Sequence, residues 1–319
     1  MKKFFEKNKV NQAFSVLLIT SAVAFSGVIL VREGSKIPWQ NFHLNIGLVI
    51  LSLIISTIGY IPAFICWKNL LSLYHIQGIT VHDLRNFVYT MLGSILPGGV
   101  WQLIGRSVLY SKQEGGSIKV AAASGLEVII IGAGAWLVYL LALFHHPGTG
   151  FIQLRVSYQI LLLVPVFFVL EPHILERLNA YVIKKLNPNL QYQRMHFPLL
   201  NVISLLLLEI LTIVIGGIAM FVFLNSIVEI STKSLIPIIA AYSFSIAVAN
   251  LLFWVPGRMI VKDGALTVAL AQFIPLGMSV IFVILIRLWT IFTILVPAGL
   301  VWVAFVFFDF LQRKRSIRS

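Results

Sequence analysis

The sequence predicts an all-α polytopic integral membrane protein. Hydrophobic residues make up 59% of the 319 residues, charged residues only 11%, and the mean hydropathy is +0.96. A soluble domain of this length needs a much larger polar surface. The apolar residues also occur in long runs, and most charges lie in the short segments between them. This alternation is typical of membrane-spanning helices joined by loops.

The composition also excludes several other classes of protein. The net charge of +13 comes from lysines and arginines in short segments between apolar runs, which favours membrane orientation over nucleic-acid binding. The single cysteine, Cys66, excludes a disulfide framework and any multi-cysteine metal site. Two histidine pairs, the adjacent His145-His146 and the loop-flanking His75 and His82, are poor candidates for metal ligands. We therefore expect no nucleic-acid partner, no metal and no cofactor.

Six apolar runs are candidates for spanning helices. A hydrocarbon core of about 30 Å needs on the order of 20 helical residues. The first run follows a basic head and is longer than the apolar part of a typical signal peptide, which favours a membrane helix over a cleaved signal peptide. The fourth run is the shortest. The six runs cover residues 13–31, 44–66, 118–143, 156–170, 198–225 and 277–308.

Two further apolar regions, 84–112 and 235–275, are each interrupted by a Pro-Gly pair. The arms of the first, 84–96 and 99–112, are too short to span comfortably. They suit a re-entrant helix pair whose turn is covered by protein rather than lipid. The arms of the second, 235–254 and 258–275, are longer, so this pair either dips into the membrane or spans it. The residues of the two breaks are Pro97, Gly98, Gly99, Pro256 and Gly257.

The distribution of positive charge sets the orientation of this layout. Sixteen of the 24 lysines and arginines lie in segments placed inside, and four lie in segments placed outside. Because cytoplasmic loops carry the excess of Lys and Arg, both termini are expected in the cytoplasm, with the chain in the cytoplasmic membrane. The remaining four lie within or beside the membrane: Arg106, Arg258, Lys262 and Arg287.

The two breaks share a spacing that indicates an internal repeat. The pattern P-G-x6-G ends at Gly105 in the first and at Gly264 in the second. Glu127 follows the first proline at almost the same distance along the chain as Arg287 follows the second. Since the breaks enter from opposite sides, we expect two inverted-topology repeats, a design associated with transport. The predicted architecture is one domain, 1–319, with repeats at 13–143 and 198–310 and a linker at 144–197.

The charges inside the membrane are the candidate site residues. A charge at the bilayer centre costs about 3 kcal/mol on insertion scales, so such residues are functional candidates. Arg106 and Arg287 carry planar forks that suit a lipid phosphate, and the exposed N–H groups after each break favour an anion. Glu127 and Glu209 either balance these arginines or meet a cationic headgroup. The alternative is that Arg287 pairs with Glu127 or Glu209 and only fixes helix packing.

A second charged group follows the second break. Arg258 comes directly after Pro256-Gly257, and Lys262 and Asp263 follow it. Adjacent residues cannot share a helix face, so these last two are interpreted either as substrate contacts or as a solvated turn near the interface.

Both broken segments resemble a known family. "ILPGGVWQLIGRSVLYSKQEGGSIKVAAASGLEVI" and "VPGRMIVKDGALTVALAQFIPLGMSVIFVILIRLW" are similar to the two signatures of the flippase-like transmembrane domain of lysylphosphatidylglycerol synthases and their stand-alone relatives. The resemblance covers roughly residues 14–308. Two positions differ from the family pattern: Val128 follows Glu127 where a basic residue is usual, and Asp263 stands where glutamate is usual. The family's charged positions fall on Arg106, Glu127, Lys262, Asp263 and Arg287.

The resemblance implies movement of a phospholipid or a lipid-linked headgroup between leaflets. Because the chain ends at "LQRKRSIRS", without the soluble synthase domain, we expect no aminoacyl-transfer reaction and no enzyme activity. Three alternatives stay open: a small-solute secondary transporter, a membrane-embedded enzyme acting on lipid phosphates, and a membrane partner of a separate transferase. If the protein moves a lipid between leaflets, its expected partner is a membrane lipid with a phosphate-bearing headgroup.

Overall fold

The computed structural model describes residues 42–76, 80–95, 101–111, 116–145, 164–186, 196–252 and 258–316, together with residues 27–28, 31–32 and 40. Within these ranges all regular structure is helical, which confirms the all-α class. The helices are α2 (Ile46–Leu73), α3 (Thr80–Met91), η3 (Leu92–Ile95), α4 (Trp101–Leu109), α5 (Gly116–His145), α7 (Val164–Leu170), α8 (Pro172–Leu186), α9 (Leu199–Asn225), η5 (Thr232–Ser234), α10 (Leu235–Leu251), α11 (Arg258–Leu270) and α12 (Leu276–Ser316).

Five segments of the described chain are long and apolar enough to cross a membrane: Ile46–Leu73, Gly116–His145, Leu199–Asn225, Thr232–Leu251 and Leu276–Phe307. The protein is therefore a membrane protein. Four of these correspond to predicted spans, and the fourth in chain order is the first arm of the second broken region. The predicted span 13–31 lies almost entirely outside the described residues. Of 156–170, only the part in α7 is described.

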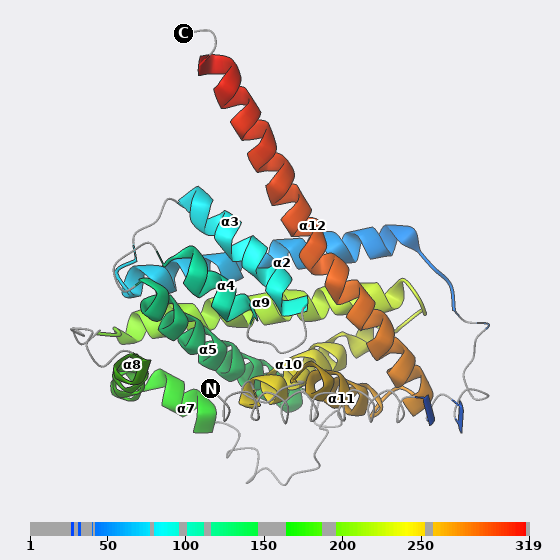
Figure 1. Cartoon of the computed structure of the whole chain (residues 1–319). Coiled ribbons are helices and arrows are strands. Elements are labelled where there is room, and N and C mark those ends of the chain that lie inside the picture. The colour runs from blue at the N-terminus through cyan, green and yellow to red at the C-terminus, as the bar shows by residue number, and fades with distance from the viewer. Residues whose placement is uncertain are drawn as a thin grey trace, which may run out of the picture.

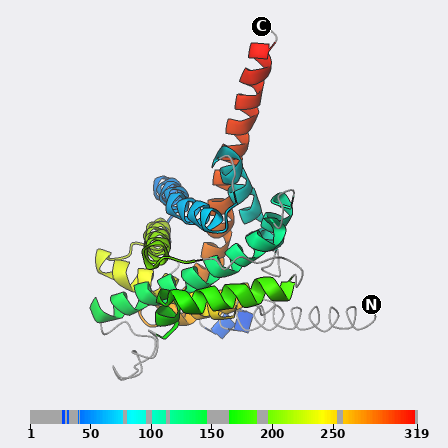
Figure 2. The same cartoon turned by 90° about the vertical axis from the view of Figure 1, so that its left-hand side faces the viewer.

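The outward faces of the long helices are apolar, as lipid contact requires. On α2 the exposed side chains recur every three or four residues and so form one stripe along the helix. The stripe consists of Ile50, Ile54, Ile58, Ile61 and Ile65. Helix α12 projects beyond the other helices at its C-terminal end (Figures 1 and 2). Further apolar side chains are exposed on the C-terminal half of α12: Leu300, Trp302, Val303, Val306 and Phe307.

The interior is formed by close packing of the long helices. Helices α2 and α9 run side by side in both views (Figures 1 and 2), and α5 packs against α9 and α10. The contact between α9 and α10 is close because it includes Gly217. A Cβ on this residue would lie 3.1 Å from the Cα of Ile239. Small residues at such points let two helix backbones approach each other, as is common within membranes.

The helices on either side of each Pro-Gly break form a pair. Helix α3 and its extension η3 pack against α4, and α10 packs against α11. A Cβ on Gly93 of η3 would lie 2.8 Å from the backbone nitrogen of Gln102, so the arms of the first pair meet where only glycine fits. The break residues Pro97, Gly98, Gly99, Pro256 and Gly257 lie outside the described residues.

A buried carboxylate fixes the first pair to α2. Asp83 of α3 is only 1% exposed and pairs with Lys68 of α2. The hydroxyl of Tyr110, directly after α4, donates to the other carboxylate oxygen over 2.6 Å. The Asp83 side chain therefore joins α2, α3 and the end of α4. It holds the first helix pair against α2.

Candidate functional site

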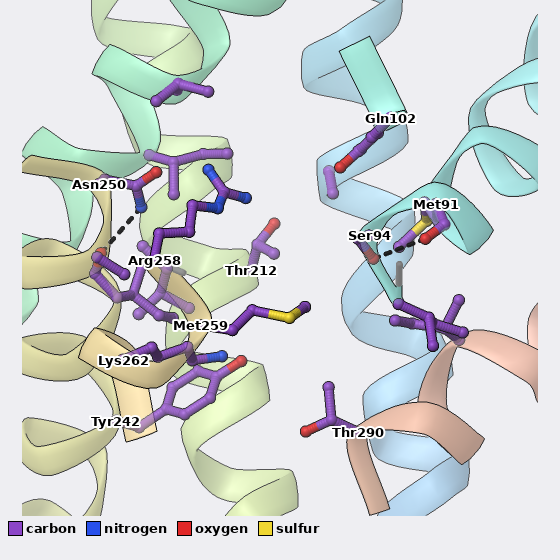
Figure 3. Close-up of a pocket in the computed structure, with 18 of the residues that line it drawn as sticks. Met91, Ser94, Gln102, Thr212, Tyr242, Asn250, Arg258, Met259, Lys262 and Thr290 are labelled. Atoms are coloured by element: carbon purple, nitrogen blue, oxygen red, sulfur yellow. Dashed lines mark hydrogen bonds between the residues drawn. The ribbon is translucent and has the colours of Figure 1, made fainter. Parts of the chain in front are cut away.

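A cavity of about 380 Å³ lies between the two helix pairs, with further lining residues from α2, α5, α9 and α12. Figure 3 shows residues of α10 and α11 on one side and residues of η3 and α4 on the other, across the open space. The charged residues that line it are Arg106, Glu127, Glu209, Arg258, Lys262, Asp263 and Arg287. The structure thus brings the predicted charged site residues from both halves of the chain into one cavity.

Arg106 is enclosed on every side by the elements around α4. It is 1% exposed, and its Nη1 donates to Glu127 Oε2 of α5. Its guanidinium carbon lies 3.9 Å from the centroid of the Trp67 ring, and its Nε donates to Thr90 Oγ1 over 3.4 Å. A cation over an aromatic face gains further electrostatic stabilisation. Both the charge and the orientation of Arg106 are therefore already satisfied within the protein.

Arg287 makes the second ion pair of the cavity, with a different partner from those expected. Its Nη1 donates to Asp263 Oδ2 over 2.8 Å. The interpretation that Arg287 pairs with Glu127 or Glu209 is therefore wrong, because the α12 residue faces α11 rather than α5 or α9. The pair is not buried, since 55% of the Arg287 side chain is exposed.

Two cations of the cavity have no carboxylate partner. Within the described chain, neither Arg258 nor Lys262 of α11 forms an ion pair. Lys262 Nζ lies 5.5 Å from the centroid of the Tyr242 ring, and both side chains extend into the cavity (Figure 3). Four residues apart on one helix, they lie on the same face. The alternative of a solvated turn for Lys262 and Asp263 is wrong, since both belong to α11 and line the cavity.

Glu209 of α9 is the unsatisfied acid of the cavity. It is 2% exposed, and its Oε1 has no hydrogen-bond partner in the described part of the protein. A buried polar atom without a partner is rare in native structures and marks a strained, catalytic or ligand-binding position. Sequence reasoning could not single out this residue, because nothing in an apolar run reveals which charges find partners.

Uncharged polar groups complete the lining, and most of them are bonded to their own helix. Thr212 donates to Leu208 O over 3.0 Å, and Asn250 donates to Ile246 O over 2.9 Å. Sequence reasoning missed some lining residues: Tyr60, Thr212, Tyr242 and Thr290. Each is a single polar residue within a span, so no pattern distinguishes it. The predicted site residue Gly105 is not among the lining residues; it faces Thr90 instead.

The rest of the cavity wall is apolar. It is formed by side chains from both helix pairs and from α5, α9 and α12: Phe87, Met91, Ile95, Ile131, Ile213, Ile246, Leu266, Ile286, Ile291 and Ile294. The lining is therefore amphipathic, with charged groups set into a hydrocarbon surface.

Among the described residues, no three His, Cys, Asp or Glu side chains are grouped so that they could hold a metal ion. Comparisons with protein-family models, with curated proteins and with solved structures gave no match for this chain.

Proposed function

We propose that this protein moves a phospholipid, or another lipid with a phosphate-bearing headgroup, between the leaflets of the cytoplasmic membrane. The observation that carries the proposal is that two cations of the cavity, Arg258 and Lys262, have no carboxylate partner among the described residues, in a cavity inside an apolar helical body. Of the four cations that line the cavity, Arg106 and Arg287 are neutralised by protein carboxylates. The other two are available to a ligand.

The chemistry of these two residues suits a phosphate. The Arg258 guanidinium offers a planar fork of donors that matches phosphate oxygens, and the Lys262 ammonium adds a compact charge. Because a charge within a membrane domain is costly unless it is paired, an anionic ligand would stabilise both. This assignment moves the proposed phosphate contact from Arg106 and Arg287 to the two residues at the start of α11.

The apolar part of the lining supports a lipid rather than a free solute. A headgroup phosphate would lie at α11 while acyl or prenyl chains contact the isoleucines and Phe87. Ligand sites commonly combine apolar walls with a few well-placed polar groups. A small anion, in contrast, would leave most of this surface without a function.

The proposed architecture is a pair of inverted repeats, each contributing one broken or re-entrant pair. Its support is that the α3–α4 and α10–α11 pairs both line the same cavity. Broken helices that meet at a central substrate site are characteristic of transporters built from inverted repeats. The excess of Lys and Arg in the segments placed inside supports a cytoplasmic position for both termini.

The direct test is lipid movement in reconstituted vesicles. The purified full-length chain is placed in liposomes with a fluorescent phosphatidylglycerol, and dithionite bleaches the label in the outer leaflet. The wild type should make the inner-leaflet label accessible. Arg258→Ala/Lys262→Ala should slow this at least about tenfold, since loss of hydrogen bonds to charged groups costs about 1.5–3 kcal/mol each.

The matched control removes the same two side-chain types elsewhere. Arg177→Ala/Lys184→Ala changes exposed residues of α8, outside the cavity lining, and should leave the rate unchanged. A wild-type protein that moves no more label than empty liposomes would refute the proposal. If it then co-purified with a soluble transferase, a role as that enzyme's membrane partner would be favoured.

A further inference from the structure

We propose that Glu209 binds a proton that enters and leaves the cavity together with the anionic headgroup, so that lipid movement is proton-coupled. This inference rests on the proposed function and adds its energy source. The structural basis is a carboxyl group that lines the cavity, is 2% exposed, and has an oxygen with no hydrogen-bond partner in the described chain.

Among the described residues, Glu209 has no cation of its own to balance an ionised carboxylate. The titratable groups that interact with it are Glu127 of α5, Cys66 of α2 and Arg106 of α4. Arg106 is already engaged by Glu127, and a second carboxylate nearby disfavours ionisation of the first. The only titratable side chains that α10 and α2 contribute to the lining are the phenols Tyr242 and Tyr60, and α7 contains no titratable side chain.

The remaining charges of the cavity belong to other elements. Helix α12 contributes Arg287, which is paired with Asp263, and α11 contributes Arg258 and Lys262. An unpaired carboxylate buried among apolar groups takes up a proton rather than bear the cost of its charge. We therefore expect Glu209 to be protonated while the headgroup is bound, and water in the emptied cavity to accept the proton when the headgroup leaves.

The charge of the cavity couples this proton to the headgroup. With Glu209 protonated, the lining carries four cations and two carboxylates; with Glu209 ionised, it carries four cations and three carboxylates. The protonated form is more positive by one charge and binds an anion more tightly. By linkage, headgroup binding strengthens proton binding by the same factor. Asp and Glu side chains within membrane helices serve as proton carriers in pumps and transporters.

The first test measures proton uptake on lipid binding. The full-length chain in detergent is titrated calorimetrically with dioctanoyl phosphatidylglycerol in two buffers of different ionisation enthalpy. The phosphodiester keeps one charge throughout, so any proton taken up belongs to the protein. The wild type should take up as much as one proton per lipid bound. Glu209→Gln should bind the lipid without proton uptake, and the control Glu176→Gln, on α8 outside the cavity, should behave as the wild type.

A second measurement does not depend on any variant. The affinity of the wild type for the same lipid should fall as pH rises, by up to about tenfold per pH unit, because one proton is linked to binding. Proteoliposomes with an imposed pH gradient should accumulate the lipid in one leaflet, and those with Glu209→Gln should not.

The outcomes separate the two proposals. Lipid binding and movement without proton uptake, or uptake that persists in Glu209→Gln, would overturn the role of Glu209 and leave the proposed function intact. Persistent uptake that disappears in Lys262→Arg would assign the proton to the lysine instead. A wild type that neither binds nor moves the lipid would overturn both.

Discussion

Arg106 and Glu127 form an ion pair directly beside the ring of Trp67, with the guanidinium carbon 3.9 Å from the ring centroid. The pair joins α4, which follows the first break, to α5, the long helix that follows it in the chain, and places both against α2. One buried contact thus ties the first helix pair to the body of the protein. The same contact occupies the arginine that sequence reasoning had assigned to the substrate.

Glu127→Gln should therefore destabilise the protein strongly. Removing one partner of a buried pair leaves an uncompensated charge, at a cost of about 3–5 kcal/mol. The measurement is the thermal unfolding midpoint of the purified chain in detergent. Replacing both partners, as in Arg106→Met/Glu127→Leu, should be less harmful than Glu127→Gln alone. If the double variant lost as much stability as the two single variants together, the two side chains would not be stabilising each other.

Gly93→Ala should disturb the contact between η3 and α4. The added Cβ would lie 2.8 Å from the backbone nitrogen of Gln102, so η3 and α4 must separate. We expect a lower unfolding midpoint and slower lipid movement in vesicles. Gly125→Ala is the matched control, because a Cβ at this position of α5 meets nothing within 4 Å. This control should be neutral or stabilising by up to about 1 kcal/mol, since glycine weakens a helix interior. Equal effects of the two variants would contradict the tight contact.

Asp83→Asn should loosen the attachment of α3 to α2. The carboxylate is buried and serves both Lys68 and Tyr110, so loss of its charge should cost about 1–3 kcal/mol. Tyr110→Phe removes only one hydrogen bond and should cost about 1 kcal/mol. The measurement is the thermal unfolding midpoint, which should be lower for Asp83→Asn than for Tyr110→Phe. The reverse order would show that the hydroxyl, and not the charge, holds the three elements together.

Glu176 should make stability depend on pH at the acidic end. The backbone N–H of Phe197 and the ring of His196 lower the pKa of this α8 carboxyl below its ordinary value of 4.5. Because the folded pKa lies below the unfolded one, the stabilisation is complete above pH 4.5 and is lost as pH falls through the folded pKa. Unfolding midpoints between about pH 6 and pH 3 should fall less steeply for Glu176→Gln than for the wild type. Parallel curves would contradict this assignment.

The membrane class and most of the spans could be predicted from the sequence, because a long apolar run is a property of the chain alone. Four of the five apolar helices described fall where runs were predicted. The charges that matter were also visible, since an ionisable residue within such a run is rare and costly. All seven charged site residues predicted in this way line the cavity.

The sequence by itself therefore determined what this protein is made of: apolar helices, two breaks, and a few charges inside the membrane. Only the tertiary structure decided which charges are satisfied. Arg106 faces Glu127 and Arg287 faces Asp263, while in the described part of the chain Lys262 has no carboxylate partner and Glu209 Oε1 has no hydrogen bond. The physical reason is that partner choice depends on the rotation and crossing of packed helices, and residues that are far apart in the chain set both.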